Sequence, residues 1–375
     1  MRIDYEPRLD FDDVLLVPQR TKAASRATIK LERNFSFYHS NSRWNGVPIF
    51  AANMDTTGTF AMSESLMKFK LGTCLHKHYD INSLVSYLTE LDYQWYSLGI
   101  KDGDFNKLME FIDKTQEVPN LCIDVANGYT DDFVEFCAKV RDELGKEPII
   151  MAGNVCTPEM VQEIILHGGV DIVKVGIGPG SACTTRLKTG IGYPQLSAII
   201  ECAHAAHGLR NGDGKLGLIC ADGGCRMPAD VVKAFAAGAD FVMLGGMFAG
   251  TEECEGDWEI EYKTRIIAYE KGGENGFVWQ SYDPGYPTQT RKKSLKFYGM
   301  SSYNAQEKYG GIKNYRSSEG RVLTIPYKGL AESVISDILG GMRSACAYTG
   351  ATCLKDFSKT ARFITVNRTH YNTDV

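Results

Sequence analysis

The sequence predicts an α/β protein that folds as a single (β/α)8 TIM barrel, with an insertion after the last barrel strand and a C-terminal closing segment. Three observations lead to this class. About eight short apolar runs recur along the chain, amphipathic stretches separate them, and nearly every run ends in Gly, Asn or Asp. A doubly wound open sheet is the alternative. In both folds ligands bind at the carboxyl ends of the strands, so candidate site residues are sought there.

The strand candidates are short, continuous and rich in Val and Ile, which is typical of parallel strands buried on both faces. One of them, near Trp95–Ile100, is weaker than the others. The clearer candidates are Pro48–Ala52, Leu71–Leu75, Leu121–Val125, Ile149–Ala152, Asp171–Val175, Leu216–Cys220 and Asp240–Leu244.

The helix candidates lie between these strands and carry apolar residues at helical spacing. Thr157-Pro158 and Met227-Pro228 are start signals, because proline suits the first helical turn, where its missing N–H costs nothing. The candidates are Thr130–Glu143, Pro158–His167, Gln195–His207 and Pro228–Ala237, with Ser333–Tyr348 as a closing helix.

Residues 251–296 break this rhythm. They are rich in charged and aromatic side chains and lack a helical period, so we interpret them as an inserted segment, either a hairpin or a solvated surface excursion. The Gly-rich residues 297–321 then predict a long substrate loop. With these two additions, residues 1–375 are interpreted as one catalytic barrel domain.

Composition excludes several classes of protein. Lys and Arg number 41 against 46 Asp and Glu, a net charge of −5, whereas general nucleic-acid or membrane-surface binders are basic. No apolar run approaches the length of a membrane span, and the charged start lacks a signal-peptide core. The 11 cysteines form no CxxC pair, so we expect reduced thiols in a cytoplasmic protein.

The segment GIGPGSACTTR (176–186) follows a strand candidate and holds the best nucleophile candidate, Cys183. Alternating glycines let the backbone turn sharply and expose its amides and carbonyls. Cys183 stands beside two threonines and Arg186, the polar and cationic surroundings expected of a reactive thiol. A plain phosphate-binding turn is the alternative, although the spacing matches neither the Rossmann fingerprint nor the Walker A loop.

Glycine pairs follow the last two strand candidates, where barrels commonly bind phosphate. In Asp222-Gly223-Gly224 and Gly245-Gly246 the backbone N–H groups can approach phosphate oxygens, and Asp222 can accept from ribose hydroxyls. Tight turns alone are the structural alternative. Lys77 is a cation at a strand end, but the flanking His76 and His78 match no zinc spacing, so no structural metal site is expected.

Long ordered motifs resemble a known family. They are GIGPGSACTTRLKTGIGYPQLSAI, AANMDTTGTF, HKHY, CIDVANGY, ADGGC, GADFVMLGGMFAG, FYGMSS and SSEGR. Together they resemble the inosine monophosphate dehydrogenase/GMP reductase family of (β/α)8 barrels, from about Asp10 to about Val366 with an interruption at 251–296. The reductase branch fits better, because CTTR resembles it and no regulatory domain interrupts the barrel.

The resemblance implies NADPH-dependent reductive deamination of GMP to IMP and ammonia, a step of purine nucleotide salvage. Cys183 matches the family nucleophile, which attacks purine C2 and forms a covalent thioimidate. Thr185 and Glu319 match the residues that relay the proton to the leaving amine. A monovalent cation, potassium, is implied at backbone carbonyls, and the implied assembly is a homotetramer that shares cofactor sites between subunits.

The remaining implied residues follow the same motifs. The GMP contacts are Asp222, Gly223, Gly224, Gly245, Gly246, Gly299, Met300, Ser301, Arg316, Ser317, Ser318 and Gly320, with Glu319 beside them. The NADPH contacts are Ser25, Arg26, Lys77, Asp124, Val125, Ala126, Ile177, Gly178, Met300, Tyr315, Arg316, Ser344 and Cys346. The cation site comprises Gly178, Gly180, Cys183 and Arg186. Ser25 and Arg26 are expected to reach the cofactor of a neighbouring subunit.

Two departures from the family pattern bear on function. Ala345 and Ala347 stand where relatives usually have Thr, which puts hydroxyl contacts to the cofactor in question, and residues 251–296 are longer than the family pattern. Two alternatives stay open. An IMP dehydrogenase, which makes XMP with NAD⁺, would use an Arg-Tyr pair that residues 299–319 lack. A non-catalytic nucleotide-binding barrel would have no need for Cys183, Thr185 and Glu319.

Overall fold

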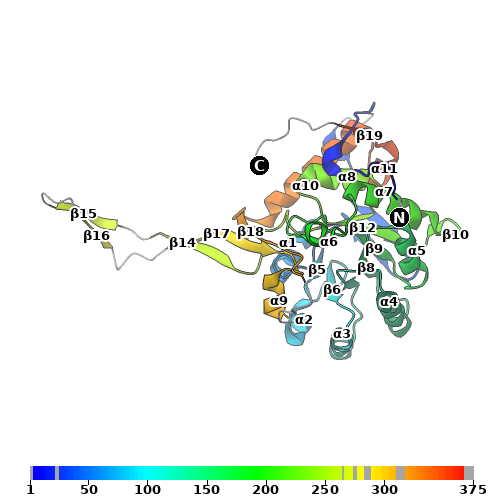
Figure 1. Ribbon diagram of the computed structural model, residues 1–375, viewed down its shortest axis with the longest axis horizontal. Helices are drawn as coiled ribbons and strands as arrows, with labels where there is room; N and C mark the ends of the chain where they lie inside the picture. Colours follow the sequence, from blue (N-terminus) through cyan, green and yellow to red (C-terminus); the bar gives the residue numbers. More distant parts are fainter. Residues whose placement is uncertain are drawn as a thin grey trace.

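The computed structural model describes residues 3–21, 25–263, 266–272, 277–282, 289–309 and 317–366. Its centre is a closed barrel of parallel strands in the order β12-β13-β4-β5-β6-β7-β8-β9 (Figure 1). This confirms the predicted fold class and excludes the open sheet. The barrel strands are β4 (Ile49–Ala51), β5 (Gly72–Leu75), β6 (Gln94–Leu98), β7 (Leu121–Asp124), β8 (Ile150–Val155), β9 (Ile172–Val175), β12 (Leu218–Asp222) and β13 (Phe241–Leu244).

Helices surround this barrel (Figure 1). The closing helix α10 packs against α1 and α8 and completes the outer layer. The surrounding helices are α1 (Phe60–Met67), α2 (Ile81–Tyr87), α3 (Asp102–Thr115), α4 (Asp131–Leu144), α5 (Pro158–Leu166), α7 (Gln195–Gly208), α8 (Pro228–Ala236) and α10 (Ala331–Thr349). Each helix candidate from the sequence is therefore confirmed, with ends that differ by a few residues. Within the described residues, no helix is both long and apolar enough to cross a membrane.

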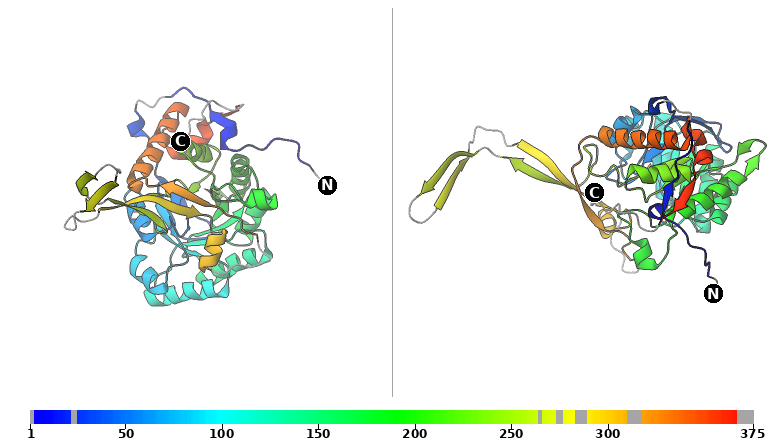
Figure 2. Two further views of the ribbon diagram at one scale, coloured as in Figure 1. Left: turned by 60° about the vertical axis from the view of Figure 1, so that its left-hand side comes forward. Right: turned by 90° about the horizontal axis from the view of Figure 1, so that it is seen from above.

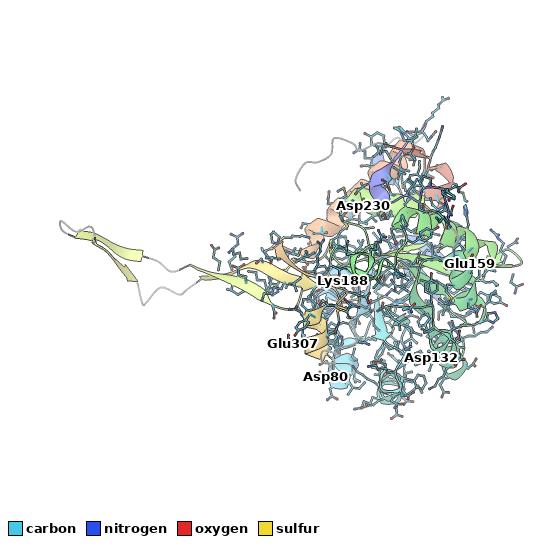
Figure 3. The ribbon with its side chains drawn as sticks, in the orientation of Figure 1. Asp80, Asp132, Glu159, Lys188, Asp230 and Glu307 are labelled. Carbon is cyan, nitrogen blue, oxygen red and sulfur yellow. The ribbon has the colours of Figure 1, made fainter. Side chains whose placement is uncertain are left out.

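Acidic side chains occupy the first turns of several surrounding helices. Figure 3 labels Asp132 of α4, Glu159 of α5 and Asp230 of α8, and also Asp80, whose carboxylate accepts from the backbone N–H groups of Asn82 and Ser83 at the start of α2. Negative charge at a helix N-terminus interacts favourably with the helix dipole. These positions help to fix where each helix begins.

Aromatic side chains close the amino-terminal end of the barrel. The antiparallel pair β2 (Arg33–Ser36) and β3 (Arg43–Gly46) carries Phe35 and Trp44 there. The Phe35 and Phe241 rings stack with centroids 4.4 Å apart, and Trp44 is buried against Phe50 with centroids 5.6 Å apart. This packing leaves only the opposite, carboxyl end of the barrel open for a ligand.

Short elements complete the described chain. β1 (Val14–Leu16) pairs with β19 (Phe363–Thr365), which joins the two ends of the chain, and β10 (Arg210–Asn211) pairs with β11 (Gly214–Lys215). The other short helices are α6 (Thr185–Thr189), α9 (Tyr303–Tyr309) and α11 (Phe357–Thr360), with 3-10 turns at Phe11–Asp13, Arg26–Thr28 and Leu354–Asp356.

The inserted segment is an antiparallel ribbon that projects from the barrel (Figure 2). β14 (Trp258–Lys263) pairs with β17 (Gln289–Tyr298), which pairs in turn with β18 (Val322–Pro326), and β15 (Ile266–Gly272) pairs with β16 (Phe277–Tyr282). The structure differs from expectation in two respects. The boundary at 296/297 falls inside β17, because that strand continues inward to pair with β18, and the predicted substrate loop contains the helix α9.

Candidate active site

A cavity of about 570 Å³ opens at the carboxyl end of the barrel. Residues that follow β4, β5, β6, β7, β9, β12 and β13 line it, together with part of the predicted substrate loop. Because all barrel strands are parallel, the polar residues at their carboxyl ends converge on this one opening. Volume and position both suit a small-molecule site.

Cys183 lines this cavity at the end of the loop after β9. The loop is held by backbone pairing with the far end of the substrate loop: Cys183 forms an antiparallel bridge with Gly320, and the Thr184 N–H donates to the Glu319 carbonyl at 2.9 Å. On its other side Gly320 packs against Ser302: a Cβ at Gly320 would lie 2.8 Å from the Cβ of Ser302, which explains the glycine there.

Three side chains of the site form a continuous hydrogen-bonded chain. Cys183 Sγ lies 3.2 Å from Thr185 Oγ1, and the Thr185 hydroxyl donates to Glu319 Oε2 at 2.7 Å. Thr185 has only one hydroxyl proton, and it is directed at the carboxylate, so its oxygen is left to accept from the thiol. The arrangement therefore provides a path for a proton from sulfur to Glu319.

Most residues predicted to contact GMP surround the same cavity. Ser318 and Gly320 lie immediately beside Glu319, and Ser317 precedes them and is exposed. Arg316 lies outside the described residues. The cavity itself is lined by Asp222, Gly223, Gly224, Gly245, Gly246, Gly299, Met300 and Ser301.

The predicted NADPH contacts fall into two groups. Lys77, Asp124, Val125, Ala126, Gly178 and Met300 line the cavity. A second group lies along α10, outside the cavity lining: Arg26 lies over the Tyr348 ring, 5.6 Å from its centroid, Ser344 is on the same helix, and Cys346 is buried. Ile177 is buried within the loop that carries Cys183, and Tyr315 lies outside the described residues.

The predicted cation residues lie on the Cys183 loop. Gly178, Gly180 and Cys183 line the cavity, but the Gly180 carbonyl accepts from the Cys183 N–H at 2.9 Å. The Arg186 side chain contacts Gly178, and its guanidinium donates to Asp10 at 3.1 Å and to the Tyr193 carbonyl. Among the described residues, no group of three His, Cys, Asp or Glu side chains is placed to hold a metal ion.

The helix α9 forms a wall of the cavity and is fastened by one buried carboxylate. Asp55 accepts from the hydroxyls of Tyr298 and Tyr309 at 2.7 and 2.8 Å, and Lys308 donates to it at 3.1 Å. Tyr309 also stacks on His78 with centroids 3.5 Å apart. Burial, followed by the charge of Lys77, lowers the pKa of His78 to about 4, so this ring is neutral near pH 7.

Some site residues are not among the predicted ones. Asn154 lines the cavity, and Lys174 lies beneath it in contact with both Asp124 and Asp222. Lys174 could have been identified from the sequence, because it interrupts the apolar strand DIVKV. A charge buried in such a strand requires partners. His78 stands within the motif HKHY that the sequence already singled out.

Comparison with known proteins agrees with this geometry. The family model described as "IMP dehydrogenase / GMP reductase domain" matches residues 96–372. A GMP reductase from Aeromonas hydrophila is 46% identical over 378 residues, covering 99% of each chain. A GMP reductase from Escherichia coli O139:H28 is 48% identical over 372 residues, covering 98% of this chain and 97% of its own, and one from Shigella boydii serotype 4 has the same values.

This chain belongs to the IMP dehydrogenase/GMP reductase family. The resemblance inferred from the motifs is therefore confirmed. Within this family the carboxyl end of the barrel is the natural place for nucleotide chemistry, and the thiol, hydroxyl and carboxylate chain lies there. Membership alone does not assign roles to individual residues, which rest on the contacts described above.

Proposed function

We propose that this protein is an NADPH-dependent GMP reductase that converts GMP to IMP and ammonia. The observation that carries the proposal is the Cys183–Thr185–Glu319 chain at the cavity wall, in a family member about half identical to proteins named GMP reductase. A thiol, a proton relay and a nucleotide-sized cavity are the parts that such a reaction requires.

The first step is addition of sulfur to the purine. The Cys183 thiol passes its proton to Thr185 Oγ1 while the Thr185 hydroxyl proton moves to Glu319, and the thiolate attacks C2 of the guanine ring. The electron pair of the C2=N3 double bond moves to N3, and C2 becomes tetrahedral and carries both sulfur and the amine. Attack requires a thiolate, so this relay sets the rate at which sulfur becomes nucleophilic.

The second step is departure of ammonia. An amine leaves as a neutral molecule only when it receives a proton, and the proton held by Glu319 returns through Thr185 for this purpose. The electron pair on N3 re-forms the C2=N3 double bond, the C–N bond to the amine breaks, and a thioimidate remains between Cys183 and C2. A dinucleotide held by Lys77, Asp124, Val125 and Ala126 would supply the hydride that reduces this carbon. The C–S bond then breaks, the electron pair returns to sulfur, and IMP is released.

The nucleotide is held by backbone and carboxylate groups. Asp222 accepts from the ribose hydroxyls, and the amides around Gly223, Gly224, Gly245 and Gly246 hold the phosphate. This reliance on backbone donors explains how a chain of net charge −5 binds an anion. The substrate-loop residues Gly299 to Ser301 and Arg316 to Gly320 complete the purine end of the site.

The residues present fit a dinucleotide beside GMP. Lys77 is a half-exposed cation on the cavity wall, near Asp124, Val125 and Ala126, and can hold a phosphate of NADPH. Ser25, Arg26 and Ser344 lie outside this cavity, so their contacts require a neighbouring subunit in a homotetramer, whereas the buried Cys346 has no exposed surface for such a contact. With alanines at Ala345 and Ala347, α10 offers the cofactor no hydroxyl at either position.

A potassium ion at Gly178, Gly180 and Cys183 is also part of the proposal. Backbone carbonyls suit a monovalent cation because they supply oxygen without full negative charge. Arg186 then acts by packing against Gly178 and not through its guanidinium, which Asp10 and Tyr193 already engage. The ion would fix the shape of the loop that carries the thiol. All 11 cysteines are free, which suits the proposed cytoplasmic location.

One assay tests the proposal. The protein is mixed with GMP and NADPH, and NADPH absorbance and ammonia are followed together. Equal loss of NADPH and release of ammonia is the expected result. No loss with GMP, together with NADH formed from IMP and NAD⁺, would instead identify an IMP dehydrogenase. Absence of turnover in both directions, with GMP still bound, would identify a non-catalytic nucleotide-binding barrel.

A further inference from the structure

Lys174 is a charged side chain at the centre of the barrel wall. It lies on β9, is 0% exposed, and its Cα pairs with Gly153 on β8 and Cys220 on β12. A Cβ at Gly153 would lie 2.6 Å from the Cβ of Lys174, so the glycine makes room for the lysine. A buried ammonium ion is costly unless it is paired, which directs attention to its partners.

Two carboxylates of the site share this one ammonium. Lys174 Nζ is hydrogen-bonded to Asp124 and lies 3.3 Å from Asp222 Oδ2. The carboxylates end β7 and β12, on either side of β8 and β9. Both line the cavity and are partly exposed to it, at 35% and 18% of their side-chain area.

Asn154 adds a neutral partner. Its side-chain amide donates to Asp222 Oδ2 at 2.9 Å and to the Gly176 carbonyl at 2.8 Å. One oxygen of Asp222 is thus occupied by protein donors, and the other is left for a ligand. Burial alone would lower the pKa of Lys174, but Asp124 and Asp222 outweigh it and hold the pKa well above its ordinary value. The lysine is therefore charged throughout the physiological range.

We propose that Lys174 is a positioning residue that couples the affinity for GMP to the affinity for the dinucleotide. The inference rests on the proposed function, in which Asp222 binds the GMP ribose and Asp124 contacts the cofactor. The ammonium divides its interactions between the two carboxylates. A ligand that binds one carboxylate changes how strongly Lys174 interacts with the other carboxylate. The resulting coupling between the two ligand affinities is equal in both directions.

Asp124→Asn tests the coupling without removing the lysine. With Asp124 neutral, Lys174 pairs with Asp222 alone and weakens it as an acceptor for the ribose hydroxyls. We expect the Kd for GMP, measured by calorimetry without dinucleotide, to rise about fivefold. Loss of a negative charge near a GMP dianion would by itself strengthen binding, so a general electrostatic effect has the opposite sign.

Asp104→Asn is the matched control. Asp104 lines the same cavity on α3 and lies 3.9 Å from Lys77, and it is not a partner of Lys174. The Asp104→Asn substitution removes the same charge, so the affinity of this variant for GMP should equal or slightly exceed that of the wild type. If Asp124→Asn binds GMP as tightly as this control, the inference is wrong.

Lys174→Met gives a second measurement. The Kd for GMP is determined with and without saturating NADP⁺, which binds without permitting turnover. In the wild type the two values should differ about fivefold, and in Lys174→Met they should agree within about twofold. A merely structural lysine would lower the melting temperature and leave the ratio unchanged. If this variant does not fold, Asp124→Asn decides alone.

The outcomes separate the two proposals. If the wild type does not bind GMP, the proposed function fails. If it binds GMP and reduces it while Asp124→Asn behaves as Asp104→Asn, only the coupling fails. A wild-type GMP affinity that NADP⁺ leaves unchanged would also overturn the coupling.

Discussion

The two ends of the barrel both contain buried ionic groups but use them differently. At the closed end, Asp240 is 2% exposed and meets two cations, Arg33 at 3.4 Å and Lys215 at 3.5 Å, as well as the imidazole Nε2 of His207 at 2.6 Å. At the open end one cation, Lys174, serves two carboxylates. The closed end has an excess of positive partners around one acid, and the open end has acids that are only partly satisfied.

This difference explains which end binds ligands. The Asp240 carboxylate is buried and surrounded by donors, so it has no acceptor capacity left for a ligand. The carboxylates at the open end retain exposed oxygens that face the cavity. We infer that charge at the closed end contributes to stability, whereas charge at the open end contributes to binding and catalysis. Four predictions test this division.

Cys183→Ala should have the largest effect, because it removes the nucleophile and leaves the fold intact. Turnover of GMP should fall by about 10⁴-fold or more, while GMP binding and the melting temperature are retained. NADPH oxidation and calorimetry provide the measurements. Cys225→Ala is the matched control: that thiol lines the same cavity, and burial raises its pKa well above the ordinary value, so it should be unreactive. Appreciable turnover by Cys183→Ala would contradict the covalent mechanism.

Glu319→Gln should slow ammonia release more than hydride transfer. The amide cannot hold the proton that the leaving amine requires, and such a loss commonly costs about 10²- to 10⁴-fold. Single-turnover measurements of ammonia and NADPH separate the two steps. Glu307→Gln, an exposed position on α9 labelled in Figure 3, removes the same charge from the same loop and should be neutral. Equal slowing of both steps would argue against the proton role.

Asp240→Asn should lower stability by about 2 kcal/mol and leave GMP affinity unchanged, because it leaves the partly exposed Arg33 and Lys215 without their buried carboxylate. Burial alone would raise the pKa of Asp240, but His207, Lys215 and Arg33 outweigh it and hold the pKa well below its usual value of 3.8. A lowered folded-state pKa stabilises the protein above pH 3.8, and this contribution is lost as the pH falls below it.

Denaturant unfolding at several pH values measures this effect. The wild type should lose stability more steeply than Asp240→Asn as the pH falls below 3.8, since the variant has no carboxylate to protonate. If Asp240→Asn instead weakened GMP binding at full stability, the division between the two ends of the barrel would be wrong.

Truncation of the projecting ribbon should have the smallest effect. Lys263 and Gln289 are register partners, so residues 264–288 can be replaced by an Asn-Gly turn that joins β14 to β17. Among the described residues, none of those that line the cavity lies within the removed segment, and kcat/KM should stay within about twofold of the wild type. A larger loss, or a change of oligomeric state by light scattering, would assign the insertion to the site or to subunit packing.

Much of the fold could be predicted from the sequence because its signals are local. Runs such as Leu121–Val125 and Asp240–Leu244 are buried on both faces and so stay continuously apolar. The strand at Gln94–Leu98 gave a weaker signal because it contains Gln94, Tyr96 and Ser97, whose burial depends on neighbours distant in the chain. The inward extension of β17 likewise depends on pairing with β18, which no local pattern encodes.

The candidate site was predictable where motifs carry it. Cys183, Thr185 and Glu319 stand within motifs, and the structure brings them into contact across 134 residues. Lys174 was visible as a lysine in an apolar strand, but its partners are set by barrel order and could not be named. The predicted cofactor residues along α10 differ, because the structure does not place them at the cavity. Their predicted role depends on a second subunit, whose position one chain does not specify.

The backbone pairing between Cys183 and Gly320 has a consequence for how activity arises during folding. The two residues are far apart in the sequence, so their pairing becomes stable only when the intervening barrel strands β12 and β13 offset the entropy cost of closing the loop. Until then Glu319 is far from the sulfur, and the thiol has no acceptor for its proton. A nascent or partly unfolded chain therefore has an unactivated cysteine, and the completed fold itself makes the cysteine reactive.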